Sequence, residues 1–425
     1  MGLWAALALT TARAAEPETL RDAWAAASVD DPRTAAAAER VEAADAALAA
    51  TQALRAPVVM FEAGLTQLGA TPAVRAALPP PLPADARLPL QQSGSSSYRG
   101  LASWPLYTGG RIAASIRAAT AGTEAARALQ TGVQADVRLA VARAYVDVLR
   151  TAARVAVLRE QRDALAAHAA DAGNLFRAGV VTRADAMAAD VSLAEAERRR
   201  ISAGTEHALA RAAYNRQLSR PPHAPVDLAD LSPPASPRAA LEDLIAAALE
   251  RREELAALRA ESEAQAARAA ARRAEAAPQL AITGGFTYQE NRYQVHPGLW
   301  SIGIGLRWNV WDGGLVRRSA AALAAEARAT ARTLDDARAD VRLHVLAESV
   351  RLDDAERRLT VAAAAREQAA ASAGVARDQY VSGAAGATQA LEAIGRLASA
   401  ARDLCEARYD VVFGNLALAR ATGEL

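Results

Sequence analysis

The stretch Trp104-Pro-Leu-Tyr-Thr-Gly-Gly110 ends a short alternating segment and precedes a very long run rich in Ala and Arg. A close copy, Trp308-Asn-Val-Trp-Asp-Gly-Gly314, stands 204 residues later in the same setting. Paired glycines at such a point favour a sharp turn from a strand into a helix, because glycine adopts backbone conformations that other residues avoid. The strand-to-helix turns are therefore predicted at Gly109, Gly110, Gly313 and Gly314.

The copy is part of a repeat that covers nearly the whole chain. The offset of 204 residues holds from about residue 98 to 219, and it pairs, for example, Val137 with Val341. Upstream an offset of 221 residues applies, which pairs Pro57 with Pro278. Such self-similarity indicates a tandem duplication. The expected organisation is a signal peptide over 1–15, a first repeat over 16–219, a Pro-rich linker over 220–237 and a second repeat over 238–425.

Each copy has the same order of expected elements: helix, strand, loop, strand, Gly-Gly turn, long helix, short break, helix. Residues 112–177 contain no Pro and are rich in good helix formers, so they predict one helix of roughly 100 Å. Helices of this length are typical of coiled-coil-like assemblies. The strands are expected at about 57–67, 98–107, 279–289 and 300–311, and the long helices at 111–177, 183–218, 315–381 and 388–422.

The expected strands alternate between apolar and polar or small residues. From Trp300 to Val310 the even positions are all apolar, while the odd positions are Ser, Gly, Arg or Asn. Of 18 aromatic residues, 10 fall within 57–107 and 280–311. Short alternating strands with many aromatics are typical of a membrane barrel with aromatic girdles. The girdle is assigned to Trp104, Tyr107, Trp300, Trp308 and Trp311. The alternative is a small soluble sheet that caps a helical bundle.

Four strands are too few to close a membrane barrel, which needs about eight. Two copies of the chain would supply 8 strands and three copies would supply 12, so satisfying the sheet edges requires a homo-oligomer. No run of about 18 apolar residues follows the signal-like start, so no transmembrane helix is expected. The predicted fold class is mainly α, with duplicated helical hairpins and a small β-barrel part.

Composition argues against several other functions. The formal charge of +1 gives no indication of nucleic-acid binding, and every basic residue except histidine is Arg. One cysteine, Cys405, excludes a disulfide within the chain. The five histidines lack ligand spacing, and no phosphate loop follows a strand. We therefore expect no enzymatic activity, no cofactor and no metal.

The ordered set of features resembles the TolC family of outer-membrane efflux and secretion channels. The resemblance rests on the duplication, on both Gly-Gly turns, and on the ending Ala407-Arg-Tyr-Asp-Val-Val-Phe-Gly-Asn-Leu416. It also rests on two hairpin tips, Phe176-Arg-Ala-Gly-Val-Val-Thr-Arg-Ala-Asp185 and Tyr380-Val-Ser-Gly-Ala-Ala-Gly-Ala-Thr-Gln389.

The resemblance implies a homotrimer in the outer membrane of a Gram-negative bacterium, with a 12-stranded barrel continuing into a helical periplasmic tunnel. Its implied partners are outer-membrane lipid, a periplasmic membrane-fusion adaptor protein and an inner-membrane pump of RND or ABC type. The adaptor would dock at the tips, near Gly179, Thr182 and Gly383. Loops 68–97 and 290–299 would face outside.

The resemblance also implies a gate of inward acidic side chains near the tips. The matching positions are Glu392, which keeps the charge, and Gln389, which does not; Asp185 is the equivalent of Gln389 in the first copy. Three copies of Glu392 around a narrow axis would attract cations. The alternatives are a solvated helix face for Glu392 and a helix N-terminal charge for Asp185.

Three functions remain open from the sequence. The first is the passive exit duct of a tripartite efflux system. The second is the duct of a type I protein-secretion system, which would use the same architecture. The third is a soluble periplasmic coiled-coil scaffold, which would need no detergent for extraction.

Overall fold

The computed structural model describes residues 17–76, 79, 81, 86–232 and 239–425. The expected signal peptide lies outside these residues. The chain divides into two compact units. Unit 1 comprises the chain up to Glu39 together with Ala128–Ala256 and Asp335–Leu425, and unit 2 comprises Arg40–Arg127 and Ala257–Leu334.

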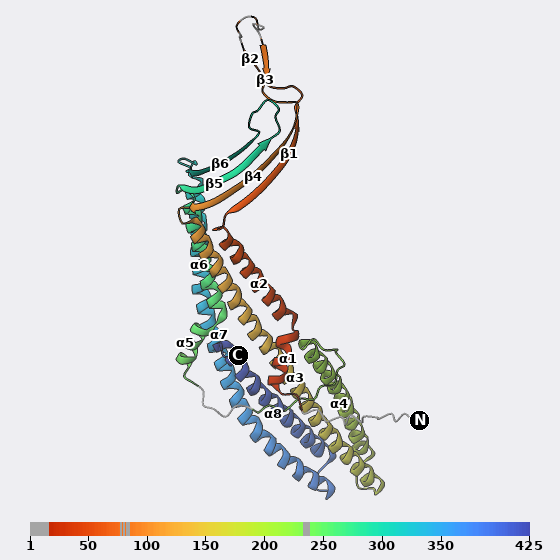
Figure 1. The fold of residues 1–425 in the computed structure, drawn as a ribbon. Helices are drawn as coiled ribbons and strands as arrows, with labels where there is room; N and C mark the ends of the chain where they lie inside the picture. The colour runs from red at the N-terminus through yellow and green to blue at the C-terminus, as the bar shows by residue number, and fades with distance from the viewer. Residues whose placement is uncertain (1–16, 77–78, 80, 82–85, 233–238) are drawn as a thin grey trace, which may run out of the picture. The chain divides into compact units, whose positions relative to one another are not determined.

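Unit 2 contains one antiparallel sheet of four strands in the order β1-β4-β5-β6 (Figure 1). The strands are β1 Val58–Gln67, β4 Gly94–Tyr107, β5 Gln279–Gln289 and β6 Gly298–Arg307. The register aligns Phe61 with Gly100, Gly100 with Phe286, and Phe286 with Trp300. Each cross-strand row therefore places residues from both sequence repeats on one face of the sheet.

The strand ends differ from the sequence expectation in two places. The segment 68–97, expected as a loop, contains the ribbon of β2 Ala73–Ala76 and β3 Ala86–Pro89 and the start of β4. β6 ends at Arg307 rather than at residue 311. It ends there because the indole of Trp308 donates to Ala276 O at 3.1 Å, and Asp312 Oδ1 accepts from Gly314 N at 2.8 Å, which turns the chain into the next helix.

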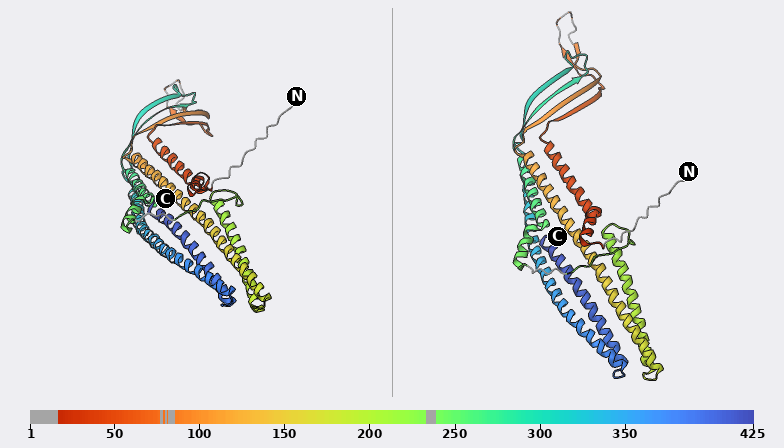
Figure 2. Two further views of the ribbon diagram at one scale, coloured as in Figure 1. Left: turned by 90° about the horizontal axis from the view of Figure 1, so that it is seen from below. Right: turned by 60° about the horizontal axis from the view of Figure 1, so that its bottom comes forward.

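Four helices contribute residues to both units. These are α2 Pro32–Ala53, α3 Arg111–Arg177, α6 Glu253–Ala274 and α7 Leu315–Val381. Unit 1 also holds α1 Leu20–Asp30, α4 Arg183–Gln217, α5 Leu241–Arg251 and α8 Ala387–Thr422. Within unit 1, α3–α4 and α7–α8 form two helical hairpins whose tips lie side by side (Figure 2).

The core of unit 1 lies where α3, α4 and α8 meet α1. Tyr145 and Tyr214 are fully buried there, with ring centroids 5.9 Å apart in an edge-to-face arrangement. Tyr145 Oη lies 2.7 Å from Glu18 O and 2.6 Å from Ala229 O, so it can donate to either carbonyl. Desolvation by burial raises the pKa of Tyr145 to about 12. The hydroxyl is therefore a neutral donor that ties the start of the first repeat and the linker between the repeats to α3.

The predicted fold class is confirmed in this architecture: long duplicated helical hairpins and a small antiparallel sheet. Within the ranges given above, no helix is both long enough and apolar enough to cross a membrane.

Candidate functional site

The two hairpin tips share one backbone design. Gly179 and Gly383 both have φ of +75° in the left-handed region. At the first tip Val180 N donates to Leu175 O at 2.9 Å, and at the second Ala384 N donates to Gln379 O at 2.8 Å. These are six-to-one Schellman bonds, which satisfy helix-end carbonyls and favour glycine at the left-handed position. Both predicted tip glycines are thus turn glycines at equivalent points of the repeat.

The tips differ in how the following helix begins. Thr182 is the N-cap of α4, and its Oγ1 accepts from Asp185 N at 3.2 Å. Asp185 Oδ2 accepts in return from Thr182 N at 3.1 Å and from Thr182 Oγ1 at 2.7 Å. At the second tip the N-cap is Gly386, which has no side chain to offer. The capping box therefore fixes the first tip alone, and Asp185 has a structural role there.

Removing the cap hydroxyl should loosen the first tip in a pH-dependent way. Thr182→Ala is expected to cost about 1 kcal/mol of local stability, because Asp185 N loses its acceptor and the Asp185 carboxylate loses the hydroxyl donor. Hydrogen bonds from the Thr182 hydroxyl and backbone hold the pKa of Asp185 below its ordinary value. A depressed carboxyl pKa stabilises the folded tip above the unfolded pKa and loses that effect as pH falls through the folded pKa.

The measurement is amide hydrogen exchange at the start of α4, at pH 7 and at acid pH. Wild type should exchange more slowly than Thr182→Ala at pH 7, and the difference between them should become smaller in acid, where only the bond from Asp185 N to Thr182 Oγ1 remains. Thr205→Ala is the control, since it removes an exposed hydroxyl that accepts no capping bond and donates to Ile201 O in the same helix. Equal exchange in all three proteins at pH 7 would contradict the capping role.

A small buried core joins the two hairpins just behind the tips. Tyr380 of α7 is only 2% exposed and packs with Ala172, Ala189, Ala387 and Ala390 from the other three helices. The ring of His168 on α3 lies 4.5 Å from the Tyr380 ring, centroid to centroid. Burial lowers the pKa of His168 and raises the pKa of Tyr380. Both groups are therefore neutral at pH 7, and the contact between hairpins is an apolar one.

Several predicted tip residues meet in one place. A pocket of about 350 Å³ is lined by Thr182 and Asp185 of the first tip and by Tyr380 and Gly383 of the second. Gln389 and Glu392 do not line it; both are exposed on α8. Glu392 is 63% exposed at its side chain, and its carboxylate lies 3.7 Å from Arg396 Nη2 on the next helical turn. The structure therefore brings the docking candidates Thr182 and Gly383 together with the gate candidate Asp185. Gly179 does not line the pocket, and the gate candidates Gln389 and Glu392 lie apart from it.

The four turn glycines adopt left-handed backbone conformations. Their φ angles are +60° at Gly109, +87° at Gly110, +65° at Gly313 and +84° at Gly314. The first turn is also crowded, since a Cβ added to Gly109 would lie 2.4 Å from Ala277 Cβ and 2.9 Å from Ala274 O. A Cβ on Gly313, the equivalent residue of the second copy, would meet nothing within 4 Å.

The tryptophans beside these turns repeat one hydrogen bond. Trp104 Nε1 donates to Arg55 O at 3.0 Å, and Trp308 Nε1 donates to Ala276 O at 3.1 Å. The two donors are 204 residues apart and the two acceptors are 221 residues apart, which are the two offsets of the repeat. Each indole therefore ties the end of a strand to the end of the preceding helix and leaves its apolar surface outward. The other girdle candidates, Tyr107, Trp300 and Trp311, are also exposed.

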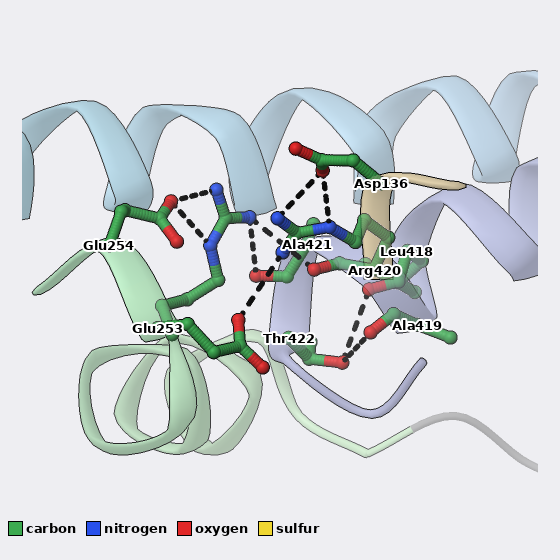
Figure 3. Close-up of polar contacts among 9 residues, drawn as sticks. Asp136, Glu253, Glu254, Leu418, Ala419, Arg420, Ala421 and Thr422 are labelled. Atoms are coloured by element: carbon green, nitrogen blue, oxygen red, sulfur yellow. Dashed lines mark hydrogen bonds and ion pairs between the residues drawn. The ribbon is translucent and has the colours of Figure 1, made fainter. Parts of the chain in front are cut away.

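A network that the sequence interpretation missed anchors the end of α8 (Figure 3). Arg420 is 7% exposed; its Nε donates to Asp136 Oδ1 at 2.9 Å, and its Nη1 lies 3.7 Å from Glu253 Oε2. Arg252, also buried, donates to Ala421 O at 3.2 Å and pairs with Glu254. These groups fasten the break between α5 and α6 to the last turn of α8.

The first repeat has the same device with the charges exchanged. Asp31 stands where the offset of 221 puts Arg252, and Arg33 stands where it puts Glu254. Arg33 Nη2 donates to Asp31 Oδ2 at 2.8 Å and to Gln217 Oε1 at 3.0 Å, at the end of α4. The hydrogen bonds from Arg33 hold the pKa of Asp31 below its ordinary value. An opposite-charge pair at equivalent helix breaks is the signal in the sequence that would have revealed both anchors.

Exposed antiparallel strands with one apolar face, joined by Gly-Gly turns to duplicated helical hairpins, are the architecture of an outer-membrane channel protein. The family model for outer membrane efflux proteins matches residues 25–215 and 244–424, which is most of the chain. The chain belongs to this outer membrane efflux protein family. It is an outer-membrane protein and an efflux-type duct, and its family consists of transport channels. This location sets aside the soluble periplasmic scaffold.

Solved structures of similar fold include several outer-membrane channels. The outer membrane protein VceC of Vibrio cholerae is 17% identical, with a TM-score of 0.81 over 95% of this chain and 96% of that one. The MtrE channel of Neisseria gonorrhoeae is 17% identical, with a TM-score of 0.77 over 95% and 88%. The CmeC channel of Campylobacter jejuni is 14% identical, with a TM-score of 0.77 over 95% and 85%. No curated protein matches the chain by sequence.

Proposed function

We propose that three copies of this chain form the passive exit duct of a tripartite efflux system. The duct docks to a periplasmic adaptor at the hairpin tips and is served by an inner-membrane pump. The observation that carries the proposal is the sheet of unit 2, which has two unpaired edges and two chemically different faces.

One face of the sheet suits lipid. The rows Leu280–Leu306, Ile282–Ile304 and Phe286–Trp300 pair apolar side chains across β5 and β6. Trp300 is 78% exposed and Ile304 72% exposed in the single chain. Exposing this much apolar surface to water is unfavourable, and a continuous patch of this kind indicates contact with a membrane or a partner.

The opposite face suits a water-filled lumen. Thr283 pairs with Gly303, and Glu62 pairs with Arg99. Arg99 Nη1 lies 3.6 Å from Glu62 Oε2, and both side chains are half exposed. A strand that is apolar on one side and small or polar on the other is the pattern of an outer-membrane barrel wall.

The sheet edges favour closure by other copies of the chain. β1 and β6 are the edge strands, and they run in opposite directions in an all-antiparallel sheet. The β6 of one copy can therefore pair with the β1 of the next and keep the antiparallel order. In a membrane no edge can remain unpaired. Three copies supply 12 strands, an even number within the range of known barrels.

The tips support docking of a partner. Large apolar side chains are exposed around both turns, namely Phe176, Val180, Met187 and Val381. The glycine turns at Gly179 and Gly383 leave open space where a Cβ would stand, so another backbone can approach closely. Thr182 and Gly383 both line the pocket shared by the tips. An adaptor hairpin that presents apolar side chains fits this surface. The pump behind it, of RND or ABC type, decides between drug-type efflux and protein secretion.

The first test is the native mass of the protein extracted from outer membranes, corrected for bound detergent. A mass of three chains supports the closed 12-stranded barrel. A monomer or a dimer would overturn the trimeric duct. Co-purification of the adaptor with wild type, and its loss from a Val180→Asp/Val381→Asp variant that remains trimeric, would then test the docking surface.

Glu392 is proposed to contribute to a gate, and its neutralisation should change ion selectivity. Glu392→Gln is expected to lower the cation-over-anion permeability ratio by about threefold, because three carboxylates leave the axis at once. The measurement is the reversal potential of single channels in a salt gradient. Glu406→Gln is the matched control, since the Glu406 side chain is 46% exposed on α8 and also faces an arginine, Arg402, at 3.9 Å. An unchanged ratio in Glu392→Gln would refute the gate assignment.

A further inference from the structure

The segment that links β6 to α7 forms an exposed surface with an apolar and a basic part. We call residues 308–318 the Trp–Arg step. Trp311 is 87% exposed and Val310 75% exposed, and Trp308 and Leu315 are also more than half exposed. Because β6 ends at Arg307, this segment lies outside the hydrogen-bonded ladder of the sheet. These four apolar side chains therefore have neither a strand partner nor a core to cover them, whereas Val316 in the same segment is buried.

The basic part of the step is a pair of arginines at the start of α7. Arg317 and Arg318 are both exposed, and in the described part of the chain neither forms an ion pair. Both side chains lie over the Gly-Gly turn: a Cβ built on Gly314 would be 3.8 Å from Arg318 Nε and 4.0 Å from Arg317 Nη2. The arginine pair is thus held over the turn that follows Trp311 in the chain.

The position of these arginines is electrostatically unfavourable without a partner. The N-terminus of a helix carries a partial positive charge, so cations in the first turn are disfavoured. α7 has no acidic residue in its first turn, and Asp312 uses its two oxygens to accept from Gly314 N and Val316 N. The first repeat has Ala113 and Ala114 at the positions equivalent to the arginines. The basic pair is therefore a property of the second junction alone, and an external anion would satisfy it.

We propose that the Trp–Arg step binds the phosphate of an anionic phospholipid at the membrane interface. The apolar face of β6, which ends in Leu306, stops next to the step, so the step lies where acyl chains give way to headgroups. Trp is enriched at this level because its ring is apolar and its N–H is polar. Guanidinium groups bind phosphate in a bidentate way. A free phosphate would leave Val310 and Trp311 uncovered, so lipid is the occupant; this inference rests on the proposed insertion of the sheet.

The test compares lipid retention by the intact, detergent-extracted protein. The probes are phosphatidylglycerol and phosphatidylcholine, added in equal amounts and counted by native mass spectrometry. Wild type should retain phosphatidylglycerol about tenfold more than Arg317→Gln/Arg318→Gln does, since each basic residue near a surface attracts anionic lipid. Arg328→Gln/Arg342→Gln is the matched control, because it removes two exposed charges from the same helix. The control should behave as wild type.

Each other outcome counts against the proposal. Equal loss in the control would show general electrostatic attraction instead of a site, and no loss in either variant would show no site. Displacement of the lipid by inorganic phosphate at comparable concentration would identify a free-anion site.

A second variant, Trp311→Ala, keeps the basic pair and should lose lipid while trimers persist. If the arginine variant alone loses its trimeric mass, the step is a contact between copies. A wild type that is not trimeric refutes the proposed duct, whereas a trimer without lipid preference refutes only this site.

Discussion

Replacing Gly109 by alanine should strongly reduce the amount of folded protein, whereas replacing Gly313 should reduce it much less. Both residues have left-handed backbone, at φ of +60° and +65°, so both substitutions cost about 1–2 kcal/mol. Only at Gly109 does the new Cβ also overlap Ala277 Cβ, at 2.4 Å, and Ala274 O, at 2.9 Å. Overpacking of this kind adds about 1–3 kcal/mol or more, because a backbone carbonyl cannot move aside as a flexible side chain can.

The two variants control for each other, since they stand at the same position of the two repeats. The measurement is the amount of folded protein in the outer membrane, determined for wild type and both variants. Equal losses in the two variants would show that the φ angle alone matters and that the contact with the end of α6 does not. Gly110→Ala serves as a further reference, because its φ is +87° and a Cβ there meets nothing within 4 Å.

This asymmetry marks the limit of what the sequence predicts. The repeated Gly-Gly pairs identify the turns, because the left-handed backbone of a tight turn after a strand is a local property that favours glycine. The alternation from Trp300 to Val310 likewise predicts the apolar face that β5 and β6 share. The crowding at Gly109 depends on Ala277, which is distant in the chain, and no local pattern reveals such a contact. The sequence therefore predicts where the chain turns but not which turn tolerates a side chain.

The tips show the same division between local and long-range causes. Thr182 and Asp185 stand three residues apart, and this spacing is enough to predict a capping box. The packing of Tyr380 against His168 is not predictable in this way, because it joins α7 to α3 and depends on the pairing of two hairpins. The ribbon of β2 and β3 was missed for another reason: its strands are four residues long and lie in a Pro-rich segment that reads as a loop.

The anchor at the end of α8 should be the most sensitive charged site in unit 1. Arg420→Leu is expected to destabilise the chain by about 3–5 kcal/mol, because Glu253, whose side chain is only 16% exposed, loses its cationic partner. Arg396→Leu removes an exposed arginine from the same helix, whose pair with Glu392 contributes about 0–1 kcal/mol. Thermal unfolding of the detergent-extracted protein should separate the two variants clearly.

A double variant distinguishes the loss of a partner from the loss of packing. In Arg420→Leu/Glu253→Gln the uncompensated carboxylate is gone, so part of the lost stability should return. Neither Arg420 Nη1 nor Glu253 Oε2 has a hydrogen-bond partner, so the attraction between them is mainly electrostatic. No recovery in the double variant would mean that Arg420 acts through its packing and its bond to Asp136 instead.

The anchor of the first repeat should respond in the same way. There the buried group is the acid Asp31, and Arg33 joins it to the end of α4. The stability lost in Arg33→Leu should therefore be partly restored by Asp31→Asn.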